Sequence, residues 1–428
     1  MPVGRTHARC RRVCGRIVVL CWAAVTTAHA LAGAGAWIAP TADGLRMALV
    51  SPTLGYGKDI VMAELQANAL PEIPGYTLRE VGIESTMDGS VEPSVIGYPE
   101  YVTPGAPDAR SLPLLVGIHS WSTTRFSSAQ QQAAVAADEG WLSVFPEFRG
   151  PNLPGNPRVT QAGASLLAQH DVIDAVEYMK AHFPVDERRI YIQGGSGGGH
   201  MSLQMLCKYP DLWAACASWV PITSMQEWWE EQNGYAPFVE AVCGGRPGDS
   251  PEVDWEYLRR SPRTFITNAL NTPTRVAHGQ MDGTICYEQS WRTYTRLRQY
   301  PGHKVRFTSD STGHYADYVE GARWLSGFIR SAEQPRHQWL VTDEAKWYFW
   351  CYVAPASETA LATCTAGITD TDGEMLLTVT LQGAREVRID LVALGVEIEG
   401  PETVDGMLTI TPAEASSQST HRFPARTR

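Results

Sequence analysis

The stretch that decides the fold is Ile190-Tyr191-Ile192-Gln193-Gly194-Gly195-Ser196-Gly197-Gly198-Gly199-His200. Its first four residues predict a buried strand, and the residues from His200 onward predict a helix. The glycines two positions before and after Ser196 allow a turn so tight that side chains there would collide. The sequence therefore predicts a strand, a turn and a helix that present the Ser196 hydroxyl above one edge of a sheet.

A glycine-rich turn before a helix can also bind phosphate. Here no lysine follows the glycines, they do not follow the G-x-G-x-x-G pattern, and the chain is acidic. We therefore interpret Ser196 as a nucleophile. The free N–H groups of the helix N-terminus would face the charge that develops on an attacked carbonyl.

Outward from this turn, apolar strands alternate with helical patterns from about Pro113 to Ala332, which predicts a mainly parallel sheet with helices on both faces. The expected strands are Leu114–His119, Trp141–Pro146, Ile190–Gly194, Trp213–Trp219, Thr274–His278 and Val305–Thr308. The expected helices are Ala129–Asp138, Ala164–His182, His200–Tyr209, Tyr287–Arg298 and Tyr315–Ser331. Residues 221–262 exceed the length of a crossover, so we expect a cap-like insertion within a domain at 111–332.

Strand-like runs flank this domain. Thr77–Ile83 and Pro93–Tyr98, around the turn Met87-Asp88-Gly89, predict that residues 31–110 contribute antiparallel strands leading into the sheet. Residues 338–411 are expected to form a small β domain, and the polar residues 412–428 a loose tail. The fold class is thus α/β with an N-terminal strand extension and a small C-terminal β domain.

Composition excludes several functions. The 428 residues carry 35 Lys and Arg against 46 Asp and Glu, a net charge of -11, which argues against nucleic acid or an anionic membrane surface as a partner. With 44% hydrophobic and 19% charged residues, the chain is expected to fold into compact domains rather than stay disordered.

The first thirty residues predict a secretory signal. They contain five arginines and no acid, then the apolar run Ile17–Val25 and the small-x-small site Ala28-His29-Ala30. We therefore expect a secreted or periplasmic protein with no membrane contact after cleavage. The pair Arg11-Arg12 leaves a twin-arginine route open, and an uncleaved anchor is the other alternative.

Cysteine usage agrees with export. Loss of Cys10, Cys14 and Cys21 with the signal leaves six cysteines, an even set that suggests disulfides. Local spacing favours Cys351 with Cys364 and Cys207 with Cys216, which leaves Cys243 to pair with Cys286, but Cys207 and Cys216 could instead be free buried thiols. Without a C-x-x-C pair no zinc site is expected, and we predict neither a metal nor a cofactor.

A nucleophilic serine needs a base that is oriented by an acid. Asp282 follows the expected strand Thr274–His278, and His314 follows Val305–Thr308, so both lie on loops beyond strand ends. Ser196, Asp282 and His314 are therefore the predicted catalytic residues. Asp282 could instead be a turn-former and His314 a capping or surface residue, and Glu288 is the alternative acid.

The predicted oxyanion hole uses the N–H of Gly197 and that of Ser120 or Trp121, on the loop after the first parallel strand. Trp121, Trp228 and Trp229 are the predicted substrate pocket, with Tyr235 and Phe238 nearby. Plain core packing of these aromatics is the alternative.

The remaining histidines and acidic residues near these motifs are predicted to have structural rather than catalytic roles. His200, His278 and His303 are expected to pack locally, and His170 with Asp171 to open a helix whose Asp174 and Glu177 form a solvated face.

These features resemble the α/β-hydrolase superfamily and, more closely, the catalytic domain of the prolyl oligopeptidase family. The landmarks lie within residues 110–332 and are Leu114–Trp121, Asp171–Phe183 with the turn Pro184–Arg189, the Gly-Gly-Ser-Gly-Gly turn, Arg260-Ser261-Pro262, His278-Gly279 with Asp282, and Gly313-His314. The resemblance implies an α/β-hydrolase fold and an acyl-enzyme mechanism. Ser196 would attack, His314 would act as base and then as acid, and Asp282 would hold the imidazole.

The chain also departs from that family. Its members usually carry a long β-propeller before the catalytic domain, which the roughly eighty residues here cannot form. Ser120-Trp121 stands where relatives often have Gly-Gly. Three functions follow as alternatives: a serine peptidase acting on short peptides, an esterase acting on small-molecule or oligosaccharide esters of the feruloyl or acetyl type, and a hydrolase-fold binding protein without activity.

Overall fold

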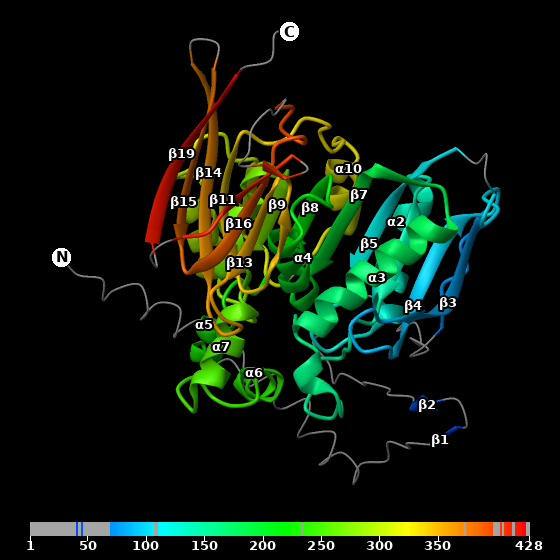
Figure 1. Ribbon diagram of the computed structural model, residues 1–428. Helices are drawn as coiled ribbons and strands as arrows, with labels where there is room; N and C mark the ends of the chain where they lie inside the picture. The colour runs from blue at the N-terminus through cyan, green and yellow to red at the C-terminus, as the bar shows by residue number, and fades with distance from the viewer. Residues whose placement is uncertain are drawn as a thin grey trace.

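The computed structural model describes residues 69–106, 110–232, 234–371, 374–396, 403–404, 406–412 and 416–424, together with the short paired strands β1 (Pro40–Thr41) and β2 (Gly44–Leu45). The predicted signal at residues 1–30 lies outside the described residues. Figure 1 shows a central sheet with helices on its faces, a group of short helices at one end, and a β-sandwich beside it.

An eight-stranded sheet forms the catalytic half, in the order β10-β9-β8-β7-β5-β6-β4-β3. Its strands are β3 (Tyr76–Glu84), β4 (Val91–Pro99), β5 (Leu112–Ile118), β6 (Leu142–Pro146), β7 (Val185–Gly195), β8 (Ala215–Trp219), β9 (Thr274–Gly279) and β10 (Val305–Asp310). β5 to β10 pair in parallel, and β4 and β3 add an antiparallel edge. The predicted α/β-hydrolase fold is thus confirmed, with the N-terminal strands built into the same sheet.

Helices cover both faces of this sheet. The main hydrophobic core includes side chains of α3 (Leu166–His182), α4 (Gly197–Lys208), the 3₁₀ helix η3 (Ile266–Asn271) and α9 (Tyr287–Leu297). The short 3₁₀ helix η2 (Val159–Gln161) precedes α3. Side chains of α2 (Arg125–Asp138) and α10 (Tyr318–Leu325) pack in a second core on the opposite face. Four of the parallel strands, β5, β6, β8 and β9, are buried along their whole length, as expected of strands covered on both faces, whereas the edge strand β10 buries only Val305.

The segment between β8 and β9 holds the short helices α5 (Met225–Glu230), α6 (Ala236–Cys243), α7 (Pro251–Arg259) and α8 (Pro262–Phe265), which precede η3. The side chain of Ser224 accepts the N–H of Glu227 in the first turn of α5, and that of Ser250 accepts the N–H of Val253 in the first turn of α7, which explains where these helices begin. In Figure 1, α5, α6 and α7 gather at the lower end of the molecule.

Residues after 336 form an antiparallel β-sandwich with its own core. One sheet has the order β11-β14-β15-β19 and the other β12-β13-β16-β18-β17. The strands are β11 (His337–Thr342), β12 (Lys346–Tyr348), β13 (Cys351–Pro355), β14 (Ala362–Thr371), β15 (Glu374–Gln382), β16 (Ala384–Asp390), β17 (Thr403–Val404), β18 (Met407–Ile410) and β19 (Ser416–Pro424).

The prediction of a loose C-terminal tail is wrong for β19, which pairs with β15 along its whole length. Its side chains alternate between half-buried and exposed without a fully buried one, the pattern of an edge strand. A polar sequence can therefore form a strand here because β15 supplies the backbone partners.

The structure shows that two of the predicted disulfides are wrong. Cys207, Cys216 and Cys243 are buried free thiols, so the pairs 207–216 and 243–286 are wrong, and Cys286, which is disulfide-bonded, does not use Cys243. Cys351 and Cys364 are also thiols, but their sulfur atoms lie only 3.7 Å apart.

Among the described residues, no helix combines the length and apolarity that a bilayer crossing requires.

Candidate active site

The turn between β7 and α4 holds Ser196 in an unusual backbone conformation, with φ 60° and ψ −121°. This left-handed region is costly for a residue with a β-carbon. A β-carbon on Gly194 would lie 2.5 Å from the carbonyl group of Gly198, which explains why the turn needs glycine on both sides. The backbone N–H of Ser196 donates to the Trp219 carbonyl at 2.9 Å, so β8 fixes the turn.

Asp282 and His314 form a hydrogen-bonded pair across the loops after β9 and β10. His314 Nδ1 lies 2.7 Å from Asp282 Oδ2, and the Asp282 side chain is fully buried while that of His314 is 28% exposed. When Nδ1–H donates to the carboxylate, Nε2 is left free to accept a proton. The Met281 N–H donates to the Thr312 carbonyl at 3.0 Å and holds the two loops together.

The Asp282 carboxylate is kept ionised by its neighbours. Its Oδ1 accepts the backbone N–H groups of Thr284 and Ile285 at 2.8 and 3.0 Å. Burial alone raises the pKa of Asp282, but hydrogen bonds from His278 and His314 outweigh it and hold that pKa well below its ordinary value. His278 Nε2 lies 3.3 Å from Asp282 Oδ2, so this histidine, expected only to pack locally, contacts the predicted catalytic acid.

Ser196, Asp282 and His314 follow the carboxyl ends of the parallel strands β7, β9 and β10, at the same edge of the sheet. A β-carbon on Gly195 would lie 2.8 Å from the Ala316 methyl group and 2.9 Å from the Tyr318 hydroxyl oxygen, so the segment after His314 rests on the serine turn. Glu288, the alternative acid, lies in the first turn of α9, whereas the hydrogen bond of His314 goes to Asp282.

The loop after β5 brings the predicted oxyanion donors beside the turn. A β-carbon on Gly197 would overlap the backbone nitrogen of Trp121, so these two amides are close neighbours. The Ser120 N–H donates to Thr123 Oγ1 at 2.9 Å and is thereby occupied. The Trp121 N–H has no hydrogen-bond acceptor within the part of the chain that the structure describes. Of the two predicted alternatives, Trp121 therefore has the available amide.

The predicted pocket tryptophans lie close to this loop, and two of them are buried. Trp121 and Trp228 are 2% and 1% exposed, and their rings meet edge to face at 4.8 Å. Trp228 Nε1 donates to the Thr284 carbonyl at 3.1 Å, which joins α5 to the Asp282 loop. Trp229 is half-buried and donates to Glu240 within the insertion at 2.9 Å.

One further histidine, His200, lies near the start of α4. His200 is buried with Nε2 2.6 Å from the Arg260 carbonyl, as expected of a packed residue. Burial lowers its pKa to about 4.

No cluster of His, Cys, Asp or Glu that could hold a metal ion occurs among the described residues.

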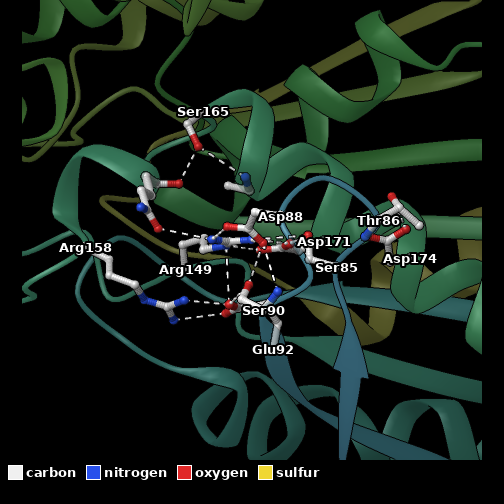
Figure 2. A network of polar contacts seen from close by, with 12 residues as sticks. Ser85, Thr86, Asp88, Ser90, Glu92, Arg149, Arg158, Ser165, Asp171 and Asp174 are labelled. Atoms are coloured by element: carbon white, nitrogen blue, oxygen red, sulfur yellow. Dashed lines mark hydrogen bonds and ion pairs between the residues drawn. The ribbon is translucent and has the colours of Figure 1, made fainter.

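Sequence reasoning missed a buried polar network behind the oxyanion loop (Figure 2). Arg149, on the loop after β6, is 1% exposed, and its Nε donates to Asp171 Oδ2 at 2.7 Å. Asp174, expected on a solvated face, is buried and accepts the N–H and hydroxyl of Thr86 at 2.9 and 2.8 Å. That expectation is wrong because the β3–β4 turn covers this part of α3. Phe148-Arg149-Gly150-Pro151 marks a tight loop in sequence, but no local pattern names the distant partners of Arg149.

The sheet domain that carries these residues is similar to known proteins. The prolyl oligopeptidase family matches residues 126–324. The uncharacterized peptidase YtmA of Bacillus subtilis is 28% identical over 163 residues, 38% of this chain and 60% of that protein. The acylamino-acid-releasing enzyme of Rattus norvegicus is 25% identical over 206 residues, 45% of this chain and 27% of that protein.

An esterase is also similar: acetylxylan esterase A of Emericella nidulans is 20% identical over 280 residues, 62% of this chain and 88% of that protein. This chain thus spans less than two thirds of the two peptidase relatives but most of the esterase. Residues 126–324, which run from α2 to α10 and make up slightly less than half of the chain, therefore match the prolyl oligopeptidase family.

Proposed function

We propose that this protein is an exported serine hydrolase that cleaves an acyl bond through Ser196, His314 and Asp282. The observation that carries the proposal is the 2.7 Å hydrogen bond between His314 and the buried Asp282, on loops that adjoin the turn bearing Ser196. This is the arrangement in which an acid orients a base and the base activates a serine.

In the proposed reaction, Ser196 Oγ attacks the substrate carbonyl while His314 Nε2 takes its proton. The N–H groups of Gly197 and Trp121 stabilise the oxyanion, because they are fixed before the charge develops. His314 then protonates the leaving group, which leaves an acyl-Ser196 intermediate. Water, deprotonated by His314, releases the acid and restores the enzyme.

A fluorophosphonate probe tests the nucleophile. The full chain should be labelled at Ser196, and Ser196→Ala should lose both labelling and turnover. Ser122→Ala is the matched control, because Ser122 is an exposed serine on the oxyanion loop and its loss should change neither. Labelling that persists in Ser196→Ala would overturn the assignment, and absence of labelling in the wild type would support a binding protein without activity.

For the substrate we propose a small acyl compound, a short peptide or an ester of a small molecule or oligosaccharide. Peptidase activity is supported by the family and by the acylamino-acid-releasing relative. Esterase activity of the acetyl or feruloyl type is the second candidate, favoured by the 88% of acetylxylan esterase A that the chain spans. Values of kcat/KM on aminoacyl and prolyl anilides, compared with those on acetyl and feruloyl esters, discriminate the two. Turnover confined to esters would reject the peptidase.

Export to a secreted or periplasmic location is proposed from the arginine-rich, acid-free first thirty residues and their Ala28-His29-Ala30 site. The intact mass of protein recovered from outside the cytoplasm should correspond to a chain that begins near residue 31. Full-length protein found only inside the cell would contradict export.

In an oxidising compartment we also propose a disulfide between Cys351 and Cys364. Their sulfurs lie 3.7 Å apart, and they come from β13 and β14, which belong to different sheets of the sandwich. The bond would therefore join the two sheets and, by loop-entropy arguments, stabilise the domain by about 3 kcal/mol. Alkylation of the unfolded, unreduced protein should label Cys207 and Cys216 but spare both of these cysteines, and alkylation of Cys351 would contradict the proposal.

A further inference from the structure

The loop after β6, residues 147–152, supports the oxyanion loop from behind. The Asn152 N–H donates to the Trp121 carbonyl at 2.9 Å, on the residue whose own N–H is available. His119 Nε2 hydrogen-bonds the Glu147 carbonyl at 2.8 Å, and its ring stacks on Phe148 at 4.0 Å. The position of the Trp121 amide therefore depends on the shape of loop 147–152.

The backbone of loop 147–152 has a conformation that its own residues do not favour. Phe148 and Arg149 have φ values of 37° and 68°, in the left-handed region where side chains crowd the backbone. Consecutive non-glycine residues in such conformations persist only when surrounding contacts enforce them.

The Arg149 guanidinium supplies these contacts (Figure 2). It forms paired hydrogen bonds with Asp171 of α3, at 2.7 and 3.1 Å, and with Asp88 of the β3–β4 turn, at 2.7 and 3.0 Å. Nη1 also donates to Gln161 at 3.1 Å, and Ser85 Oγ shares the Nη2 donors at 3.2 Å. Two bidentate partners on different elements fix the orientation of the guanidinium, and through it the loop backbone.

We infer that Arg149 is a positioning residue for the oxyanion hole, acting through loop 147–152 on the Trp121 N–H. The inference rests on the proposed function. Burial lowers the pKa of Arg149, but hydrogen bonds to Asp88 and Asp171 raise it above its ordinary value, so the cation persists at every working pH. The effect of Arg149 should accordingly fall on the transition state and be independent of pH.

The test compares Arg149→Lys with Arg158→Met in the full chain. Lysine keeps the positive charge but cannot form bidentate hydrogen bonds with two carboxylates at once. Arg158 belongs to the same network, but its guanidinium binds Glu92, at 2.5 and 3.0 Å, and its side chain is 39% exposed. It therefore controls for disturbance of the same network at a residue that does not hold the loop.

We expect Arg149→Lys to lower kcat on p-nitrophenyl acetate by about 10- to 100-fold and to change KM by less than about threefold, because an oxyanion donor acts in the transition state. Its reaction with a fluorophosphonate should slow by a similar factor. The pH midpoint of kcat/KM should not move, since the His314–Asp282 pair is untouched. Arg158→Met should retain kcat within about twofold.

Several results would overturn the inference: normal kcat in a folded Arg149→Lys variant, an effect on KM alone, a shifted pH midpoint, or an equal loss in Arg158→Met. If Arg149→Lys does not fold, Asp171→Asn provides a second variant. It keeps the shape of the side chain but weakens the hydrogen bonds that Asp171 accepts from Arg149, so it should lower kcat by a smaller factor and leave KM unchanged. Failure of both to fold would assign the network to stability and reject positioning. A wild type that does not react at Ser196 defeats the proposed function, whereas a reactive wild type with an unaffected variant defeats only this inference.

Discussion

The ammonium group of Lys208 and the carboxylate of Asp343 form an ion pair in which neither side chain has any exposed surface. Lys208 ends α4 under the catalytic sheet, and Asp343 lies in the turn between β11 and β12 of the sandwich. Arg259 of α7 also reaches Asp343, with 3.1 Å between Nε and Oδ2. Charges that water cannot reach therefore join the sandwich, the sheet domain and the insertion.

We expect Asp343→Ala to lower the free energy of unfolding by about 3–5 kcal/mol, because it leaves Lys208 buried without its main partner. Replacing both residues, Lys208→Met with Asp343→Leu, should restore most of that loss. The control is Arg422→Ala, which removes a pair whose side chains are 74% and 52% exposed and should cost less than about 1 kcal/mol. Urea unfolding measures all of them, and a double variant no more stable than the single one would contradict the argument.

Asp282→Asn should lower kcat by about four orders of magnitude, because an amide nitrogen facing His314 Nδ1 favours the wrong tautomer. Glu288→Gln is the control, since it removes the other acid near the end of the same loop and should leave kcat near the wild-type value. Steady-state kinetics on the best substrate of the panel distinguishes them. A larger loss in Glu288→Gln would reverse the assignment of the acid.

Stability should fall as the pH is lowered from 7 to 5, in part through His200. Its folded pKa of about 4 lies below the ordinary 6.5, so in this range the unfolded chain takes up a proton that the folded chain does not. The expected contribution is about 2 kcal/mol. His200→Gln, whose amide can still donate to the Arg260 carbonyl, should lose this part of the pH dependence, whereas replacement of the exposed His337 should not. Urea titrations at both pH values provide the measurement.

Gly197→Ala should lower kcat by about 100-fold or more, because the new methyl group would displace the Trp121 amide from the oxyanion site. Gly155→Ala is the matched control: a β-carbon there has no neighbour within 4 Å. Similar kcat values in the two variants would argue that the amide of Trp121 takes no part in catalysis.

Local sequence patterns predict the catalytic sheet well. The strand expected at Thr274–His278 occupies Thr274–Gly279, and that expected at Val305–Thr308 occupies Val305–Asp310. Parallel strands that follow one another through helices all end at one edge of the sheet, so the loops after the two strands could be placed together, and with them Asp282 and His314, without a structure.

Features that depend on distant partners could not be predicted in this way. Asp174 has the helical spacing of a solvated residue, and only the contact with Thr86 shows that it is buried. β19 forms a strand because its backbone pairs with that of β15. The spacing of Cys207 and Cys216 in the sequence did not reveal that they are unpaired. In each case the deciding neighbour is remote in sequence.

The backbone of Ser196 lies in a region that glycine occupies at little cost and serine does not. Ser196→Gly should therefore raise the free energy of unfolding by about 1–3 kcal/mol while abolishing turnover. Laboratory evolution that rewards heat tolerance alone would then accumulate inactive descendants, because the substitution that relaxes this turn also removes the nucleophile. A thermostable lineage that still works can emerge only from a screen that scores product in every round.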